Sequence, residues 1–209
     1  MNSNNNQKSA SLLSTKSVAI MAMLAGMAVI LMLFEIPLWF APPFYELDFS
    51  EVPILIGAFA LGPVAGVVIE LLKVLLNLVI TGTDTVAVGE LANFLIGCSM
   101  VLPSSIIYHR NKTLKSAIKG LVIGSICMVI LGSFMNAFVL LPAYAYFFNM
   151  PIESLIAMGT KVNPAIDNMS TFIFYAVIPF NLIKGVAVSL ITLLVYKRIS
   201  RTIKSILDR

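Results

Sequence analysis

The chain has 209 residues, of which 59% are hydrophobic and 11% charged, and its formal net charge is +4. A soluble domain carries roughly 45–50% apolar and about 25% charged residues, so the composition excludes an ordinary soluble domain and indicates a membrane protein. The positive charge does not indicate nucleic-acid binding, because the basic residues flank apolar segments, where membrane orientation accounts for them. We predict a disordered polar tail, residues 1–15, and a single transmembrane domain, residues 16–209.

Apolar segments along the chain predict an all-α bundle of six transmembrane helices. The first helix covers residues 18–34 and is followed by an aromatic stretch, residues 36–48, whose three prolines exclude a regular helix. The next apolar stretch, residues 52–80, would be roughly 43 Å long as one helix, against a hydrocarbon core of about 30 Å. We therefore expect it to break at Gly62-Pro63. The expected helices are 18–34, 52–61, 64–80, 88–108, 117–141 (ending before Pro142) and 171–195, the last with a basic extension.

The distribution of charge predicts the orientation of this bundle. Basic residues form three groups: Lys8 and Lys16; Arg110, Lys112, Lys115 and Lys119; and Lys197, Arg198, Arg201, Lys204 and Arg209. The positive-inside rule places all three groups, and therefore both termini, in the cytoplasm. An even number of crossings must then separate Lys16 from Arg110, which supports the break at Gly62-Pro63.

Ionisable side chains within the predicted spans point to the interior of the bundle or to a functional cavity. Glu70 and Lys73 lie at i and i+3 on one helix face, where they form either an internal ion pair or part of a site. Asn93, Asn136 and Asn181 occupy three different helices at a similar depth in their outer halves, with Lys184 three residues after Asn181. That convergence predicts a pocket for a neutral ligand that makes hydrogen bonds.

Small residues line one side of the first helix, with Ala22 and Gly26 four residues apart. Such spacing lets another helix approach closely. From the spacing alone, packing within the bundle explains this strip better than a partner protein does.

Motifs for nucleotide hydrolysis and for enzymatic chemistry are absent from the sequence. It contains no GxxxxGK[ST], HExxH or GxSxG motif, and its histidine, His109, lies in a basic loop. Cys98 and Cys127 lie in apolar segments without a CxxC spacing, which indicates buried thiols rather than a metal site or a disulfide. We therefore expect no enzymatic activity, no cofactor and no ability to couple ATP hydrolysis to movement.

Several short motifs nevertheless occur in a characteristic order. They are YELDFSEVP at residues 45–53, Gly62-Pro63, Lys73, GELANF at 89–94, NAF at 136–138 and PFNLIKG at 179–185. On these motifs, the chain after residue 15 resembles the substrate-binding S component of bacterial energy-coupling factor (ECF) transporters, most closely the members specific for riboflavin.

The resemblance implies a six-helix protein of the bacterial cell membrane that binds vitamin near its outer face. Its partners would be riboflavin, a transmembrane coupling subunit that contacts Ala22 and Gly26, two cytosolic ATPases and membrane lipid. The resemblance also implies a role for each ligand-binding residue. Asn136 and Asn181 would bind the polar edge of the ring, and Lys184 would bind a ring carbonyl. The ribityl hydroxyls would be bound by Glu90, Asn93 and the backbone around Asp48. Leu47 and Phe49 would cover the ring.

Two alternative functions remain open at this point. The chain could be an S component for another flavin, such as flavin mononucleotide, although its acidic outer loops argue against a phosphate-bearing ligand. It could also be a stand-alone secondary transporter that uses Glu70 and Lys73 as an ion relay. An intramembrane enzyme has the least support, because no set of catalytic residues is present.

Overall fold

The computed structural model describes residues 14–83 and 86–207, so most of the predicted disordered tail, 1–15, lies outside the described residues. The helical elements are α1 (Thr15–Met32), α2 (Glu51–Leu61), α3 (Pro63–Thr81), α4 (Val88–Asn111), α5 (Leu114–Met135), α6 (Leu141–Phe147), α7 (Ile152–Val162), α8 (Met169–Phe172) and α9 (Ile178–Leu207), with π-helical segments η1 (Asn136–Leu140) and η2 (Ile173–Val177). The strands β1 (Ile36–Pro37) and β2 (Glu46–Leu47) form one short antiparallel pair.

The prediction of an all-helical membrane protein is confirmed. Within the described ranges, five helical stretches are long and apolar enough to cross a membrane: Thr15–Met32, Pro63–Thr81, Val88–Asn111, Leu114–Phe147 and Met169–Tyr196. The remaining expected span, α2, is apolar but has only 11 residues. The count of six membrane crossings therefore stays a prediction.

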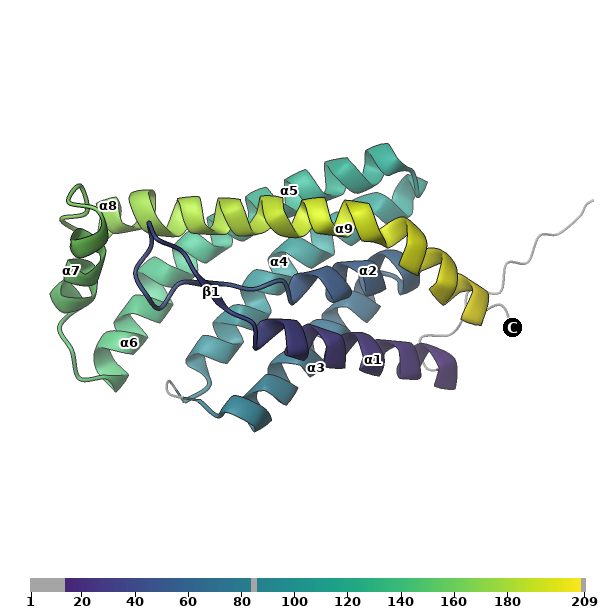
Figure 1. The fold of residues 1–209 in the computed structure, drawn as a ribbon, viewed down its shortest axis with the longest axis horizontal. Helices are drawn as coiled ribbons and strands as arrows, with labels where there is room; N and C mark the ends of the chain where they lie inside the picture. Colours follow the sequence, from purple (N-terminus) through teal and green to yellow (C-terminus); the bar gives the residue numbers. More distant parts are fainter. Residues whose placement is uncertain (1–13, 84–85, 208–209) are drawn as a thin grey trace, which may run out of the picture.

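Helix α2 lies inside the bundle, in contact with α1, α3, α4 and α9 (Figure 1). Nine of its residues, from Glu51 to Phe59, are buried. Because protein surrounds it on most sides, α2 does not need the length of a lipid-exposed span. Its end at Gly62 confirms the predicted break, since Gly62 has φ +118°, which favours glycine, and Pro63 opens α3 without losing a hydrogen bond.

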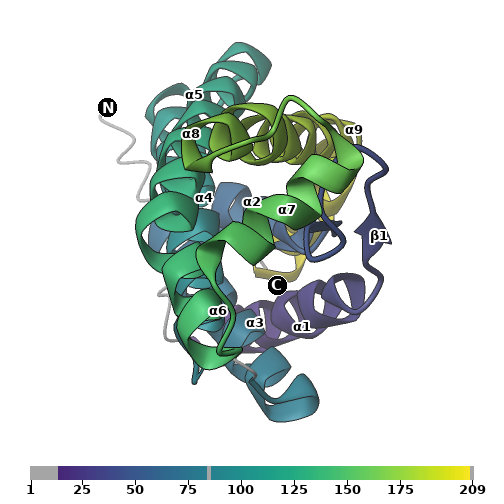
Figure 2. The ribbon, with the colours of Figure 1, turned by 90° about the vertical axis from the view of Figure 1, so that its left-hand side faces the viewer.

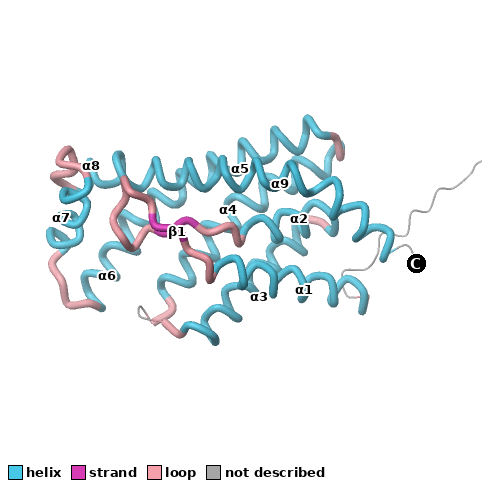
Figure 3. Tube along the Cα trace, in the orientation of Figure 1, coloured by secondary structure: helices cyan, strands magenta, loops and turns pink. Residues whose placement is uncertain are grey.

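The described chain begins and ends at the same end of the bundle. The first turn of α1, the α2–α3 turn, the α4–α5 turn and the last turn of α9 lie together on the right of Figure 1. We call this the basic end, because Lys16, Arg110, Lys112, Lys115 and Lys119 lie there. Figure 3 shows that most of the loop segments gather toward the opposite end, which we call the cavity end.

One expectation for the second half of the chain was wrong. The fifth helix does not stop before Pro142 but continues through η1 and α6 to Phe147. Pro142 is tolerated because it lies in the first turn of α6, directly after the widened turn of η1. The connection to the last span contains α7, which was not predicted and which crosses the cavity end (Figure 2). Its residues Leu155 and Gly159 are buried.

Other helix boundaries moved by a few residues for local reasons. α1 begins at Thr15 because the Ser14 side chain caps it by accepting a hydrogen bond from the Ser17 backbone N–H. In the same way, Thr113 caps α5 through the Ser116 backbone N–H. The resulting bundle has two hydrophobic clusters, one around α2 and one beneath α7, with the candidate site near their junction.

Candidate functional site

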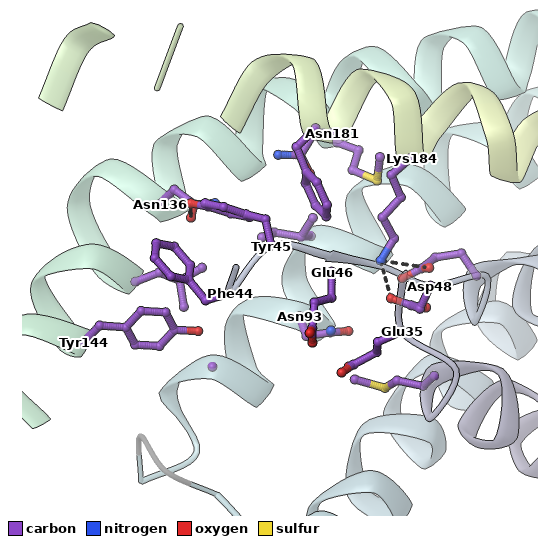
Figure 4. A pocket seen from close by; sticks show the side chains of 17 residues that line it. Glu35, Phe44, Tyr45, Glu46, Asp48, Asn93, Asn136, Tyr144, Asn181 and Lys184 are labelled. Carbon is purple, nitrogen blue, oxygen red and sulfur yellow. Dashed lines mark hydrogen bonds and ion pairs between the residues drawn. The ribbon is translucent and has the colours of Figure 1, made fainter. Parts of the chain in front are cut away.

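Two adjoining cavities lie at the cavity end, between the segment 33–50, α4, α5–α6 and α9. The inner cavity, of about 260 Å³, is lined by Asp48, Glu51, Met128, Asn136, Asn181 and Lys184 among others (Figure 4). The outer cavity, of about 510 Å³, extends toward α7 and is lined by Asn77, Glu90, Phe148, Met150, Leu155 and Met158 among others. Both are bordered by Met32, Glu35, Phe44, Glu46, Gly89, Asn93 and Tyr144. The outer cavity alone falls within the range of roughly 300–1,000 Å³ that is usual for small-molecule sites.

The structure brings together the four polar residues whose positions predicted a pocket. Asn93 from α4, Asn136 from η1, and Asn181 and Lys184 from α9 all line the inner cavity. Asp48 joins them from the segment that precedes α2, and Glu90 borders the outer cavity instead.

Leu47 and Phe49 are placed differently from the expectation that they would cover a ligand ring. Leu47 is buried in the hydrophobic cluster beneath α7, and Phe49 packs against both hydrophobic clusters. The aromatic walls of the inner cavity come from Phe44, Tyr45, Tyr144 and Phe180. In the sequence, only the density of aromatic residues beside the predicted pocket helices pointed to them. That density does not distinguish residues that line a cavity from residues that pack in the protein interior.

A buried ion-pair network holds the segment 33–50 against the helices. The Lys184 Nζ lies 2.8 Å from Asp48 Oδ2 and 3.4 Å from Glu51 Oε2. Glu51 also lies 3.4 Å from Lys73, so one carboxylate bridges both lysines. Burial alone would raise the pKa of Asp48, but the charges of Lys184 and Lys73 lower it to about 2, so Asp48 is ionised at neutral pH.

The Glu70–Lys73 ion pair expected from the i, i+3 spacing is present. The two side chains are fully buried, and Lys73 Nζ lies 2.8 Å from Glu70 Oε1. Lys73 also donates a 2.9 Å hydrogen bond to Asn93 Oδ1, which links the pair to the inner cavity. Gly97 of α4 makes room for the Glu70 carboxylate, because a Cβ at that position would lie 2.7 Å from Glu70 Cδ.

The amides of Asn136 and Asn181 are oriented by their own helices. Each donates its side-chain N–H to the carbonyl four residues earlier, at 2.8 Å to Gly132 and 3.0 Å to Val177. The Asn136 carbonyl accepts from the Tyr45 hydroxyl, whereas the Asn181 carbonyl oxygen makes no hydrogen bond within the described part of the chain and remains an acceptor. For a bidentate role, Asn136 would use its second amide N–H and the second lone pair of its carbonyl oxygen.

Both helices that carry these amides widen into π-helix beside them. η1 begins at Asn136, and η2 ends at Val177, whose carbonyl accepts from Asn181. π-Helical turns are rare and are often found at functional sites. The two π-helical turns therefore lie directly beside the two amides that line the inner cavity.

Two acidic residues at the junction of the cavities were not identified from the sequence. Glu35 follows α1 and hydrogen-bonds to Glu46 of β2, and both border the two cavities. Burial, the hydrogen bond to Glu46 and the negative charges of Glu46 and Asp48 raise the pKa of Glu35 to about 7. In the sequence, these two acids flank an aromatic segment, which was the only indication that they could act together. Their proximity depends on the β1–β2 pairing.

Ala22 and Gly26 do not pack inside this chain, contrary to the simpler explanation of the small-residue strip. Ala25 and Ala28 are buried, whereas Ala22 is exposed, and a Cβ at Gly26 would have no neighbour within 4 Å. This side of α1 is therefore open to lipid or to another protein.

Comparison with known proteins agrees with the fold. The family model described as ECF transporter, substrate-specific component, matches residues 16–196. The riboflavin transporter RibU of Staphylococcus aureus (strain TCH60) is 37% identical over 97% of this chain and 100% of its own length. The riboflavin transporter FmnP of Bacillus subtilis (strain 168) is 32% identical over 88% of this chain and 92% of its own. A solved structure described as the S component of a bacterial ECF transporter matches with a TM-score of 0.69 and 36% identity, covering 90% of this chain and 96% of that one.

The family is one of transport proteins rather than enzymes, as the sequence predicted. On the family match, the two relatives and the shared fold, this chain belongs to the substrate-specific components, or S components, of ECF transporters.

Proposed function

We propose that this S component binds riboflavin in the inner cavity and delivers it to an ATP-driven ECF transporter. The observation that carries the proposal is the convergence of Asn93, Asn136, Asn181 and Lys184 on one aromatic-walled cavity. Two of the relatives are named riboflavin transporters, which supports the same ligand.

The hydrogen-bonding groups of the cavity complement the polar edge of a flavin. That edge presents one N–H donor between two carbonyl acceptors. The free Asn181 carbonyl is suited to accept from the N–H, and Lys184, which has three N–H donors, retains capacity for a ring carbonyl beside its two carboxylate partners. Asn93 and Glu90 extend along the outer cavity, where a polyhydroxyl chain can make hydrogen bonds.

The acidic groups around the outer cavity favour riboflavin over its phosphate ester. Glu35, Glu46 and Glu90 all border this cavity, and Lys and Arg are absent from its lining among the described residues. A phosphate dianion there would meet like charge, which raises the free energy of binding. Flavin mononucleotide should therefore compete poorly with riboflavin.

Orientation follows from the charge of the two ends. The basic end carries Lys16 and the four basic residues around the α4–α5 turn, which the positive-inside rule assigns to the cytoplasm. Six crossings with both termini in the cytoplasm of a bacterial cell then place the cavity at the outer face of the membrane. The open strip at Ala22 and Gly26 is suited to the coupling subunit, which joins the chain to two cytosolic ATPases.

Titration of the purified protein with riboflavin, followed by flavin fluorescence, tests the proposal. We expect saturable binding that Asn181→Ala weakens by about tenfold or more, because the ligand N–H loses its acceptor. Ser133→Ala is the matched control, since Ser133 bonds to the Val129 carbonyl on its own helix and does not line the cavities. Wild-type protein that ignores riboflavin at micromolar concentration would reject the ligand assignment.

A reconstitution experiment separates this function from that of a stand-alone secondary transporter. Liposomes that hold this chain alone should not accumulate riboflavin under an ion gradient, whereas addition of the coupling subunit and ATPases should produce ATP-dependent uptake. Gradient-driven uptake by the chain alone that Glu70→Gln abolishes would instead support an ion relay.

A further inference from the structure

A third cavity lies at the basic end, remote from the proposed vitamin site. It has a volume of about 310 Å³ and lies where the last turn of α4 meets the first turns of α5. Its lining consists of Ile107, Arg110, Asn111, Ser116, Lys119 and Ile123. The α4–α5 turn beside it is visible at the upper right of Figure 1.

The two basic residues of this cavity have no acidic partner in the described protein. Every ion pair among the described residues joins Lys73 or Lys184 to the acids near the inner cavity. Arg110 and Lys119 make no hydrogen bond or ion pair within residues 14–83 and 86–207. They leave a concentrated positive charge at the mouth of a cavity, which an anion can neutralise.

Neutral groups in the same cavity add hydrogen-bond donors. The Ser116 hydroxyl accepts a 3.0 Å hydrogen bond from Thr113 Oγ1, and its own proton remains able to point into the cavity. The Asn111 amide supplies further N–H groups. Two cations with a hydroxyl and an amide form a donor set suited to a phosphate group.

The surface next to the cavity is apolar and unpartnered. Ile106 of α4 and Val122, Ile126 and Ile130 of α5 are exposed and continue from the cavity along the two helices, away from the basic end. A cationic cavity at the end of an apolar helix surface matches the headgroup and acyl chains of a phospholipid. A free anion would use the cations but leave this surface uncovered.

We propose that the α4–α5 cavity is a specific binding site for the phosphate of an anionic phospholipid whose acyl chains lie along Ile106, Val122, Ile126 and Ile130. The site differs from general attraction of a basic loop to a negative surface, because it depends on the two residues that line the cavity. Lys112 and Lys115 belong to the same loop region but do not line it, so they provide a charge-matched control.

Native mass spectrometry of the full-length protein, purified in detergent and titrated with phosphatidylglycerol or phosphatidylcholine, tests this proposal. We expect wild type to retain phosphatidylglycerol in preference to phosphatidylcholine, and Arg110→Gln/Lys119→Gln to bind phosphatidylglycerol at least about tenfold more weakly. Lys112→Gln/Lys115→Gln should remain within about twofold of wild type. Thermal midpoints measured for each variant establish that folding is preserved.

Three results would overturn the proposal. Equal losses in the two double variants would mean attraction by net charge alone. Equal retention of phosphatidylcholine and phosphatidylglycerol would mean that the site does not distinguish an anionic headgroup from a zwitterionic one. Displacement of phosphatidylglycerol by inorganic phosphate at about ten millimolar would mean a small-anion site rather than a lipid site.

Discussion

Substitution of Asp48 by asparagine should release the segment 33–50 from the helices. The Asp48 carboxylate accepts from Lys184 Nζ at 2.8 Å and from the Ser50 backbone N–H at 2.8 Å. Asparagine has nearly the same shape but no charge, so Lys184 would retain only Glu51, at 3.4 Å, as an ion-pair partner. The backbone of the segment is otherwise left unchanged.

The pKa of Asp48 gives the expected magnitude. Its decrease from 3.8 to about 2 corresponds to roughly 2–3 kcal/mol of stabilisation of the charged form, at about 1.4 kcal/mol per pKa unit. Because asparagine resembles the protonated acid, the Asp48→Asn variant should lose about that amount, a factor of about 70 in the equilibrium between held and released segment. In wild type this contribution is fully present above pH 3.8 and is lost as the pH falls through about 2.

Hydrogen exchange of peptides from the segment 33–50 measures the effect. The Ala41 and Tyr45 amides are hydrogen-bonded within the segment, to the carbonyls of Leu38 and Pro42, and should exchange up to about 70-fold faster in the variant. Glu153→Gln, which removes an exposed charge on α7, is the control and should have no effect there.

A double-mutant cycle that combines Asp48→Asn with Lys184→Met decides whether the Asp48–Lys184 ion pair itself holds the segment 33–50. We expect a coupling energy of about 1–3 kcal/mol, as for residues in one ion-pair network. Exchange in the segment within twofold of wild type in the Asp48→Asn variant, or a coupling energy below about 0.5 kcal/mol, would refute the reasoning.

Three further perturbations follow from the same geometry. Glu35 binds its proton more tightly in the folded protein, so its contribution to holding the segment 33–50 is present below pH 4.5 and is lost as the pH rises through about 7. Hydrogen exchange of this segment should accelerate over that pH range in wild type but not in Glu35→Gln. Identical pH profiles of the two proteins would contradict this prediction. Gly97→Ala should lower the free energy of unfolding by about 1–3 kcal/mol, because the added Cβ would overpack against the Glu70 carboxylate. Gly26→Ala, at a position with open space, should not lower it. Equal thermal midpoints of the two variants in detergent would argue against the close approach of Gly97 and Glu70. Tyr45→Phe removes the hydroxyl bound to Asn136 and should destabilise the held form of the segment 33–50 by about 1 kcal/mol, measured by hydrogen exchange. Unchanged hydrogen exchange would show that this hydrogen bond does not restrain the segment.

Local chemistry explains which parts of the fold could be predicted from the sequence. The break at Gly62-Pro63 was predictable because the missing proline N–H and the positive φ of glycine act within one turn of the chain. The continuation of the helix through Pro142 was not, because it depends on the π-helical turn η1, which forms in the context of the packed helices. Helix α7 was missed because its inward face, Leu155 and Gly159, packs only where the fold brings Phe172 and Ile166 beneath it.

The sequence by itself determined the membrane environment, the all-helical fold and the four polar residues that line the inner cavity. Asn and Lys side chains in apolar spans are costly to bury, so their presence alone marked Asn93, Asn136, Asn181 and Lys184. Tertiary structure alone decided the partners of these residues. Lys184 and Asp48 are 136 positions apart, and no periodicity connects a loop before α2 to the last helix. The aromatic walls, the Glu35–Glu46 pair and the α4–α5 cavity likewise exist only after packing, because each combines residues from two or more elements and no single helix or strand sets their proximity.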